Sequence, residues 1–217
     1  MYYSLKIVMV FVVLLFMSSC KKGPEYVLIE TTMGNMKIEL YESTPQHKEN
    51  FLKLVDEKFY DDLLFHRVIK GFMIQGGDPD SRNAEPQKRL GSGGPGYTIP
   101  QEIGSPHFKG TLAAARQGDA VNPEKKSSGS QFYIVQGNPV SENELSTFEQ
   151  TKGIKYNDIQ KKKYKELGGT PALDADYTVF GEVVEGLDVV DRIASVQTGS
   201  GDRPVEDIKM TIRRMKS

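Results

Sequence analysis

Alternating apolar and polar residues open the part of the chain that follows the first 25 residues. The segment YVLIETTMGNMKIELYES carries apolar residues at every second position on both sides of Gly34-Asn35. A Gly-Asn pair favours a tight turn, and a period of two is the pattern of strands with one buried face. The segment therefore predicts two strands joined in a hairpin.

The hydrophobic period changes from two to that of a helix after this hairpin. Ser43-Thr44-Pro45 supplies a capping residue followed by a proline near the first helical position. The residues that would share one helical face are all apolar: Phe51, Leu54, Val55 and Phe59. We expect an amphipathic helix of about four turns that covers one end of a sheet.

Short apolar runs separated by Gly, Pro, Ser and Asp follow along the chain. They read LLFHRVI, GFMIQG, GTLAAA, SQFYIV and YTVFGEVV, a spacing typical of antiparallel strands in a sandwich or a closed barrel. Leu187, Val190 and Ile193 have helical spacing and predict a second short helix over the other end of the barrel. The tail from Lys209, KMTIRRMK, predicts the last strand.

The segment 141–170 is polar, rich in lysine and without alternation. Its second half, 157–167, is ended by Gly168-Gly169 and predicts a capped, largely solvated helix. One interpretation is a surface excursion, because long inserted loops cost little free energy. A role in partner binding or in substrate gating is the other.

The first twenty residues differ from the rest. Lys6 precedes the apolar run IVMVFVVLLFM, which is followed by Ser18, Ser19 and Cys20. A run of this length is shorter than the ~20 apolar residues of a membrane span and matches the core of a signal peptide. Cys20 is the only cysteine of the chain, so it forms no internal disulfide.

The segment MSSC resembles the lipobox of bacterial lipoproteins, with Met17 where leucine is usual. We expect a signal peptide over 1–19, a lipidated Cys20 that begins a tether over 20–25, and attachment to a membrane of the bacterial cell envelope through this lipid. The protein would face the periplasm or the outside. An uncleaved N-terminal anchor and a soluble secreted form are the alternatives.

Composition limits the remaining choices. The 217 residues carry 28 Lys+Arg and 29 Asp+Glu, so no basic field invites nucleic acid. A hydrophobic content of 38% suits one core, which predicts a single domain over 26–217. No coiled coil or long apolar seam is present, and we expect a monomer.

Common catalytic and metal-binding motifs are absent. The three histidines are far apart and the one cysteine is at the N-terminus, so we expect no metal site. No G-x-S-x-G elbow occurs. The run 91–96, GSGGPG, lacks the Lys-Ser/Thr ending of a phosphate loop and is more typical of a tight turn. We expect no cofactor.

The most informative segment is FHRVIKGFMIQGGDP, residues 65–79. Arg67 lies among apolar residues there, with Gln75 eight residues later. A strand interior is an unfavourable place for a guanidinium that has neither partners nor a task. Taken alone, Arg67 could also be a strand-edge arginine whose head stays in water.

This segment resembles the central signature of the cyclophilin family. The likeness continues, in the family's order, through GSGGPGYTIPQE, GTLAAAR, SSGSQFYIV and LDADYTVFGEVVEGLDVVDRI. The resemblance implies a mainly β fold, an eight-stranded closed antiparallel barrel capped by two α-helices, with 141–170 as a partly helical insertion. It also implies a peptidyl-prolyl cis/trans isomerase that acts on proline-containing polypeptides without a cofactor and assists protein folding. Together with the expected signal peptide, this predicts that its substrates are exported proteins.

The resemblance assigns roles to individual residues. Arg67 would be the catalytic donor to the imide nitrogen, oriented by Gln75. Phe132 is the least secure pocket residue, since neighbours on a strand point to opposite faces. The substrate-binding residues carried over from the family are Phe72, Met73, Gln75, Ala115, Arg116, Gln131, Phe132, Tyr133, Leu173 and Tyr177.

Two positions depart from the family's pattern. Ala172 replaces the tryptophan of cyclosporin-sensitive members, and Tyr177 replaces a histidine. We therefore expect isomerase activity with weak cyclosporin inhibition. The alternative functions are a non-catalytic proline-peptide binding module or holdase, with 141–170 gripping the client, and a structural envelope lipoprotein.

Overall fold

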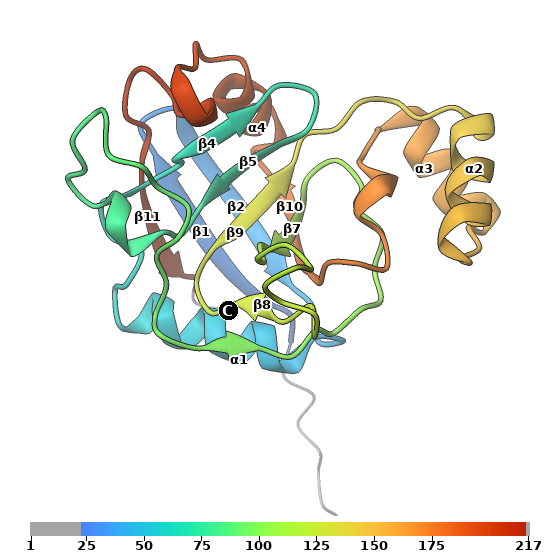
Figure 1. The fold of residues 1–217 in the computed structure, drawn as a ribbon, viewed down its shortest axis with the longest axis horizontal. Coiled ribbons are helices and arrows are strands. Elements are labelled where there is room, and N and C mark those ends of the chain that lie inside the picture. Colours follow the sequence, from blue (N-terminus) through green and yellow to red (C-terminus); the bar gives the residue numbers. More distant parts are fainter. Residues whose placement is uncertain (1–22, 216–217) are drawn as a thin grey trace, which may run out of the picture.

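The computed structural model describes residues 23–215 and consists mainly of a curled antiparallel sheet with helices around it (Figure 1). The predicted signal peptide and Cys20 lie outside the described residues. The strands are β1 (Glu25–Thr31), β2 (Gly34–Leu40), β3 (Leu63–Leu64), β4 (Arg67–Ile69), β5 (Met73–Gly76), β6 (Thr98–Ile99), β7 (Thr111–Ala114), β8 (Ser127–Ser128), β9 (Phe132–Val135), β10 (Val179–Glu185) and β11 (Lys209–Arg214). The helices are α1 (Pro45–Asp56), α2 (Glu142–Lys152), α3 (Asp158–Glu166) and α4 (Leu187–Ala194), with 3₁₀ turns η1 (Pro79–Ser81), η2 (Pro171–Leu173) and η3 (Ser200–Asp202).

The main sheet has nine strands in the order β3-β11-β1-β2-β10-β7-β9-β5-β4, and β6 and β8 form a separate pair. The mainly β, antiparallel prediction is confirmed. The predicted closure into an eight-stranded barrel is not, because β3 and β4 at the two ends of this order are not paired with each other. The chain changes partner at Phe65-His66, from β11 on one side to β5 on the other, and the ladder is interrupted there.

The predicted hairpin is present as β1 and β2, which pair from Glu25↔Leu40 to Thr31↔Gly34. Its turn lies two residues earlier than predicted, at Thr32-Met33, and Gly34 begins the second strand. Gly34 has a φ of +125°, a region that residues with a Cβ rarely adopt. Glycine is therefore needed at the start of β2 rather than within the turn.

The two predicted capping helices are α1 and α4. Helix α1 starts at Pro45 as expected, but a residue distant in sequence accepts the hydrogen bonds of its N-terminal N–H groups. The carboxylate of Glu102 accepts hydrogen bonds from the backbone of Gln46 at 3.1 Å and of His47 at 3.0 Å. The helix ends at Asp56, one turn earlier than predicted, and Phe59 packs on the core from beyond its end.

The insertion forms two helices, α2 and α3, of which only α3 was predicted. The missed helix has a capping box in which Ser141 and Glu144 satisfy each other's backbone N–H groups. The insertion is also less solvated than expected. Leu145, Tyr156 and Tyr164 from the insertion are buried in a cluster with Phe108 and Val140 of the body.

The two faces of the main sheet carry separate apolar clusters. The inner cluster is the hydrophobic core, built from β1, β2 and β11 together with the buried faces of α1 and α4. A second, smaller group, here called the outer cluster, joins Met73, Ala113, Ala115, Tyr133, Val135 and Val179. Among the described residues, no helix is long and apolar enough to cross a membrane.

Candidate active site

The register of three neighbouring strands places Arg67 on the same face as the outer cluster. Arg67 lies opposite Gln75 across β4 and β5, and Ile69 lies opposite Met73. Across β5 and β9, Gln75 lies opposite Tyr133. Because residues two apart on a strand share a face, Arg67, Met73, Gln75 and Tyr133 all project from the outer side of the sheet.

The apolar residues predicted to bind substrate gather around this cluster. Met73, Ala115 and Tyr133 are buried within it, and the partly exposed Phe72, Leu173 and Tyr177 pack against it. The rings of Tyr133 and Tyr177 meet edge to face with centroids 6.0 Å apart. The structure therefore brings Leu173 and Tyr177, from the η2 region, next to residues of β5 and β9. Strand β5 lies about 100 positions earlier in the sequence than η2.

Phe132 is the exception, and its assignment to the substrate site is corrected here. Its side chain is 1% exposed and lies in the inner cluster, edge to face with Phe51 and Phe65. The reason is strand alternation: Tyr133 points to the outer face, so Phe132 points to the inner one. Phe132 is a core residue.

Two side chains hold the guanidinium of Arg67. Its Nε donates to Oδ2 of Asp202 at 3.3 Å, and its NH1 donates to Oε1 of Gln75 at 3.5 Å. The Arg67 side chain remains 41% exposed. Among the contacts of the described residues, these two leave three of the five guanidinium N–H bonds open to a ligand. Gln75 was predicted as the orienting residue, whereas Asp202 was not predicted at all.

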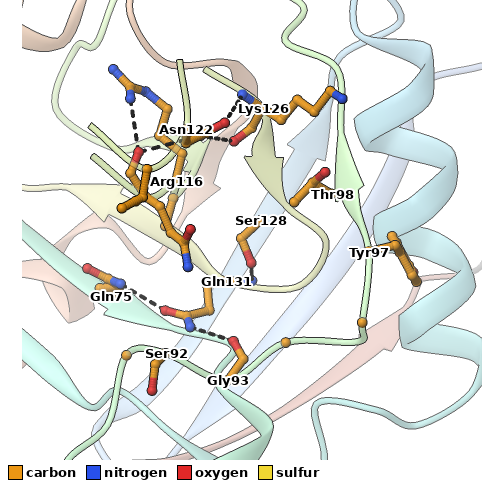
Figure 2. A pocket seen from close by; sticks show the side chains of 16 residues that line it. Gln75, Ser92, Gly93, Tyr97, Thr98, Arg116, Asn122, Lys126, Ser128 and Gln131 are labelled. Atoms are coloured by element: carbon orange, nitrogen blue, oxygen red, sulfur yellow. Dashed lines mark hydrogen bonds between the residues drawn. The ribbon is translucent and has the colours of Figure 1, made fainter. Parts of the chain in front are cut away.

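A chain of hydrogen-bonded amides runs from Gln75 through Gln131 to Gly93 (Figure 2). Gln75 Nε2 donates to Oε1 of Gln131 at 3.0 Å, and Gln131 Nε2 donates to the carbonyl of Gly93 at 2.7 Å. These residues line a hollow of about 660 Å³ that also reaches Arg116 and Lys126. The glycine run 91–96 thus forms one wall of this hollow, a role that the sequence did not suggest.

The glycine run is fixed from below by a buried carboxylate. Oδ2 of Asp78, a fully buried residue, accepts hydrogen bonds from the backbone N–H groups of Gly91 at 2.5 Å and Gly93 at 3.4 Å. A Cβ at position 93 would come within 2.1 Å of the same carboxylate. The approach is therefore open only to glycine, and the wall of the hollow is held in one place.

Arg116 closes the other side of the site. Its guanidinium lies over the ring of Tyr177, with Cζ 4.5 Å from the ring centroid, and donates to the backbone carbonyl of Asp176 at 3.0 Å. Asp176 in turn accepts hydrogen bonds from Lys125 and Lys152, both at 2.5 Å. These two hydrogen bonds lower the pKa of Asp176 from 3.8 to about 2. The loop that carries Tyr177 is thus tied to two other segments.

The arrangement suits recognition and electrostatic stabilisation. Within residues 23–215 no group of His, Cys, Asp and Glu side chains could hold a metal ion. What the site offers is a guanidinium with open donors, amide groups for a backbone, and an adjoining apolar surface. Such a site can bind an apolar ring and donate a hydrogen bond to an atom beside it.

Comparison with known proteins gives a consistent result. The family model described as "Cyclophilin type peptidyl-prolyl cis-trans isomerase/CLD" matches residues 26–216. A Staphylococcus saprophyticus protein named "Putative peptidyl-prolyl cis-trans isomerase" is 36% identical over 187 residues, which cover 83% of this chain and 86% of that protein. A protein of the same name from Staphylococcus aureus is 34% identical over 189 residues, covering 87% and 90%.

Solved structures agree on the fold. A Cryptosporidium parvum cyclophilin type peptidyl-prolyl cis-trans isomerase aligns with a TM-score of 0.65 at 24% identity, over 90% of this chain and 99% of that one. The same Cryptosporidium protein in the presence of the dipeptide Ala-Pro aligns with a TM-score of 0.64 at 23% identity, over 88% and 99%.

Proposed function

Because this chain belongs to the family of cyclophilin type peptidyl-prolyl cis-trans isomerases, we propose that it accelerates rotation about X-Pro bonds by stabilising the twisted amide with Arg67. The observation that carries the proposal is the position of Arg67. It lies on the same sheet face as Met73 and Tyr133, anchored on one side and open on the other.

The reaction requires only what this site provides. An X-Pro bond rotates over a barrier of about 18–20 kcal/mol because rotation disrupts the amide resonance, and it does so unaided in tens to hundreds of seconds. No covalent bond forms or breaks. A catalyst therefore needs to bind the twisted amide better than either planar form.

Arg67 would supply the preferential binding. As the bond twists, the imide nitrogen becomes pyramidal and its lone pair localises, so the nitrogen becomes a better hydrogen-bond acceptor. One of the open N–H groups of Arg67 would donate to this nitrogen. Because Gln75 and Asp202 already hold the guanidinium, little reorganisation is needed during rotation.

The remaining residues would bind the polypeptide. The proline ring would rest on the outer cluster, against Phe72, Met73 and Tyr133. The chain beside it would run past Ala115 and Arg116 along the hollow, with the Gln131 side chain within reach of its backbone. Contacts of the proline ring with an apolar surface and of the substrate backbone with amide groups would orient the substrate. They would impose little selectivity for the side chains beside the proline.

The decisive experiment measures turnover of a short X-Pro peptide, in a protease-coupled assay and by NMR exchange. Replacing Arg67 by alanine should lower kcat/KM by about 10²–10³, the loss seen when one preorganised donor is removed. Replacing Arg67 by lysine should recover only part of this, because a single ammonium cannot keep both anchors and also face the substrate. An unchanged rate in the alanine variant would remove the assignment. A wild-type protein that binds the peptide without turnover would instead be a binding module or holdase.

The place of action is a further part of the proposal. We place the protein on a membrane of the bacterial cell envelope, held by a lipid on Cys20 and acting on exported proteins, on the strength of the segment MSSC after an apolar run. Labelled palmitate should enter the wild-type protein in cells but not the Cys20→Ala variant. Equal labelling of the two, or none in either, would contradict lipidation at this residue.

A further inference from the structure

A buried hydrogen-bond network connects the insertion to the substrate site. Its centre is Asp174, which is 4% exposed. Oδ2 of Asp174 accepts hydrogen bonds from the hydroxyls of Tyr156 and Tyr164, both at 2.6 Å. Oδ1 accepts from the backbone N–H of His107 at 2.7 Å and lies 2.8 Å from Nδ1 of its ring. All four acceptor positions of this carboxylate are therefore occupied.

The ring of His107 carries the network to the outer cluster. A carboxylate only accepts hydrogen bonds, so Nδ1 is the donor to Asp174, and in a neutral ring Nε2 is then an acceptor. The hydroxyl of Tyr133 lies 3.0 Å from Nε2, at hydrogen-bonding distance. The rings of His107 and Tyr133 are nearly parallel, with an interplanar angle of 12°. His107 is completely buried, so no exposed group separates the insertion from Tyr133.

The insertion packs against the body through a buried ring and backbone hydrogen bonds. Tyr164 is fully buried, with its ring centroid 4.6 Å from that of Phe108. The backbone N–H of Thr170 donates to the carbonyl of His107 at 2.8 Å, and that of Lys109 donates to the carbonyl of Gly168 at 2.9 Å. Two backbone hydrogen bonds thus connect the residues that follow α3 to the segment that carries His107.

The two tyrosine hydroxyls remain donors at neutral pH. Burial, together with the neighbouring Asp174 carboxylate, raises the pKa of both Tyr156 and Tyr164 far above the ordinary value for tyrosine. Each hydroxyl therefore keeps its proton and continues to occupy Oδ2. Removing either hydroxyl would leave a buried lone pair of the Asp174 carboxylate without its donor. The carboxylate would then hold the His107 ring less tightly.

We infer that Tyr156 and Tyr164 are positioning residues for substrate binding, acting through Asp174 and His107 on the ring of Tyr133. The insertion is then an internal support of the proline-binding surface rather than an arm that grips clients. The inference rests on the proposed function, because it assigns Tyr133 to the surface that receives the proline. It names the feature that fixes that surface.

The test is a double-mutant cycle between the two ends of the network. The variants are Tyr164→Phe, Tyr133→Phe and the double substitution, each of which removes only a hydroxyl. NMR titration and exchange measurements with an Ala-Pro peptide give the dissociation constant and the on-enzyme isomerisation rate separately. Since networked residues couple strongly, Tyr164→Phe should weaken peptide binding by about threefold or more in the wild-type background and clearly less in the Tyr133→Phe background. The on-enzyme rate should change less than the dissociation constant.

Equal effects of Tyr164→Phe in the two backgrounds would overturn the inference. Tyr26→Phe is the matched control: it removes a tyrosine hydroxyl from β1, outside the network, and should leave peptide binding unchanged. All measurements are made well below the unfolding temperature of each variant, so that loss of folded protein does not enter.

A spectroscopic readout separates this inference from the proposed function. The ¹⁵N shifts of the His107 ring report its hydrogen bonds whether or not the protein turns over substrate, and they should move in Tyr164→Phe as well as in Tyr133→Phe. Unmoved shifts in Tyr164→Phe would overturn the network. A wild-type protein without isomerase activity but with coupled binding and shifted resonances would refute the proposed catalysis and leave the positioning role intact.

Discussion

The contact between Asp202 and Arg67 allows a sharp test of how the catalytic donor is held. Asp202 has a φ of +59°, a left-handed conformation that asparagine and glycine adopt more readily than alanine. Asp202→Asn removes the charge and keeps an acceptor oxygen, whereas Asp202→Gly removes the acceptor and keeps the backbone conformation. The pair of variants separates charge from geometry without adding backbone strain.

The size of the effect follows from distance and exposure. The Nε and Oδ2 atoms are 3.3 Å apart, and the side chains of Arg67 and Asp202 are 41% and 47% exposed. Exposed ion pairs contribute about 0.2–1 kcal/mol, which is at most about a fivefold factor in a rate or equilibrium constant. Asp202→Gly should therefore lower kcat/KM by about two- to fivefold, and Asp202→Asn by less, with the unfolding free energy changed by less than about 1 kcal/mol.

The assay is NMR exchange on an X-Pro peptide at low and high salt, with thermal unfolding measured in parallel. Asp56→Asn is the control, because Asp56 forms a pair of comparable exposure with Arg214 away from the site. It should leave turnover unchanged. If Asp202→Gly were as damaging as Arg67→Ala, Asp202 would have a direct role in the reaction. If it increased the rate, the carboxylate would be holding the guanidinium away from the substrate. Either result would refute the reasoning.

Three other outcomes can be checked. The folded-state pKa of Asp176 is depressed to about 2 from 3.8, so its contacts with Lys125 and Lys152 contribute stability above pH 4 that is lost as the pH falls toward 2. The unfolding temperature of Asp176→Asn should therefore depend less on pH over that range than the unfolding temperature of the wild-type protein. Parallel curves for the two proteins would contradict this. Phe132→Ala should destabilise the fold by about 3–5 kcal/mol in urea unfolding, as for a core aromatic, and a near-neutral result would return Phe132 to the surface. Since Ala172 stands in place of an indole, cyclosporin should inhibit turnover only weakly, and inhibition at low nanomolar drug would contradict this.

The sequence predicted the elements whose signals are local. The β1–β2 hairpin and α4 each rest on a short hydrophobic period, and both are present. Helix α2 was missed because its composition is polar, although the capping box from Ser141 to Glu144 was a readable local signal. The break between β3 and β4 had no such signal. It depends on which strand each half of the segment pairs with.

The predicted site residues, from Arg67 to Tyr177, lie in the segments that resemble those of the family. Arg67, Met73 and Gln75 belong to one segment, and strand alternation alone places them on one face. Asp202 reaches Arg67 from 135 residues away and carries no motif, so only the fold reveals it. The role of Asp174 was not predicted either, because its partners Tyr156 and Tyr164 lie in segment 141–170, whose polar sequence indicated a solvent-exposed segment.

Strands β5 and β9 serve the core and the substrate site with alternate residues. In a scan of all single substitutions along these strands, the kind of defect should therefore alternate from one residue to the next, between loss of folded protein and altered turnover. Changes at Ile74, Phe132 and Ile134 would reduce the amount of folded protein in the cell, whereas changes at Gln75 and Tyr133 would leave abundance closer to normal and alter turnover. Substrate preference could thus be redesigned on one side of these strands while the other side keeps the molecule folded.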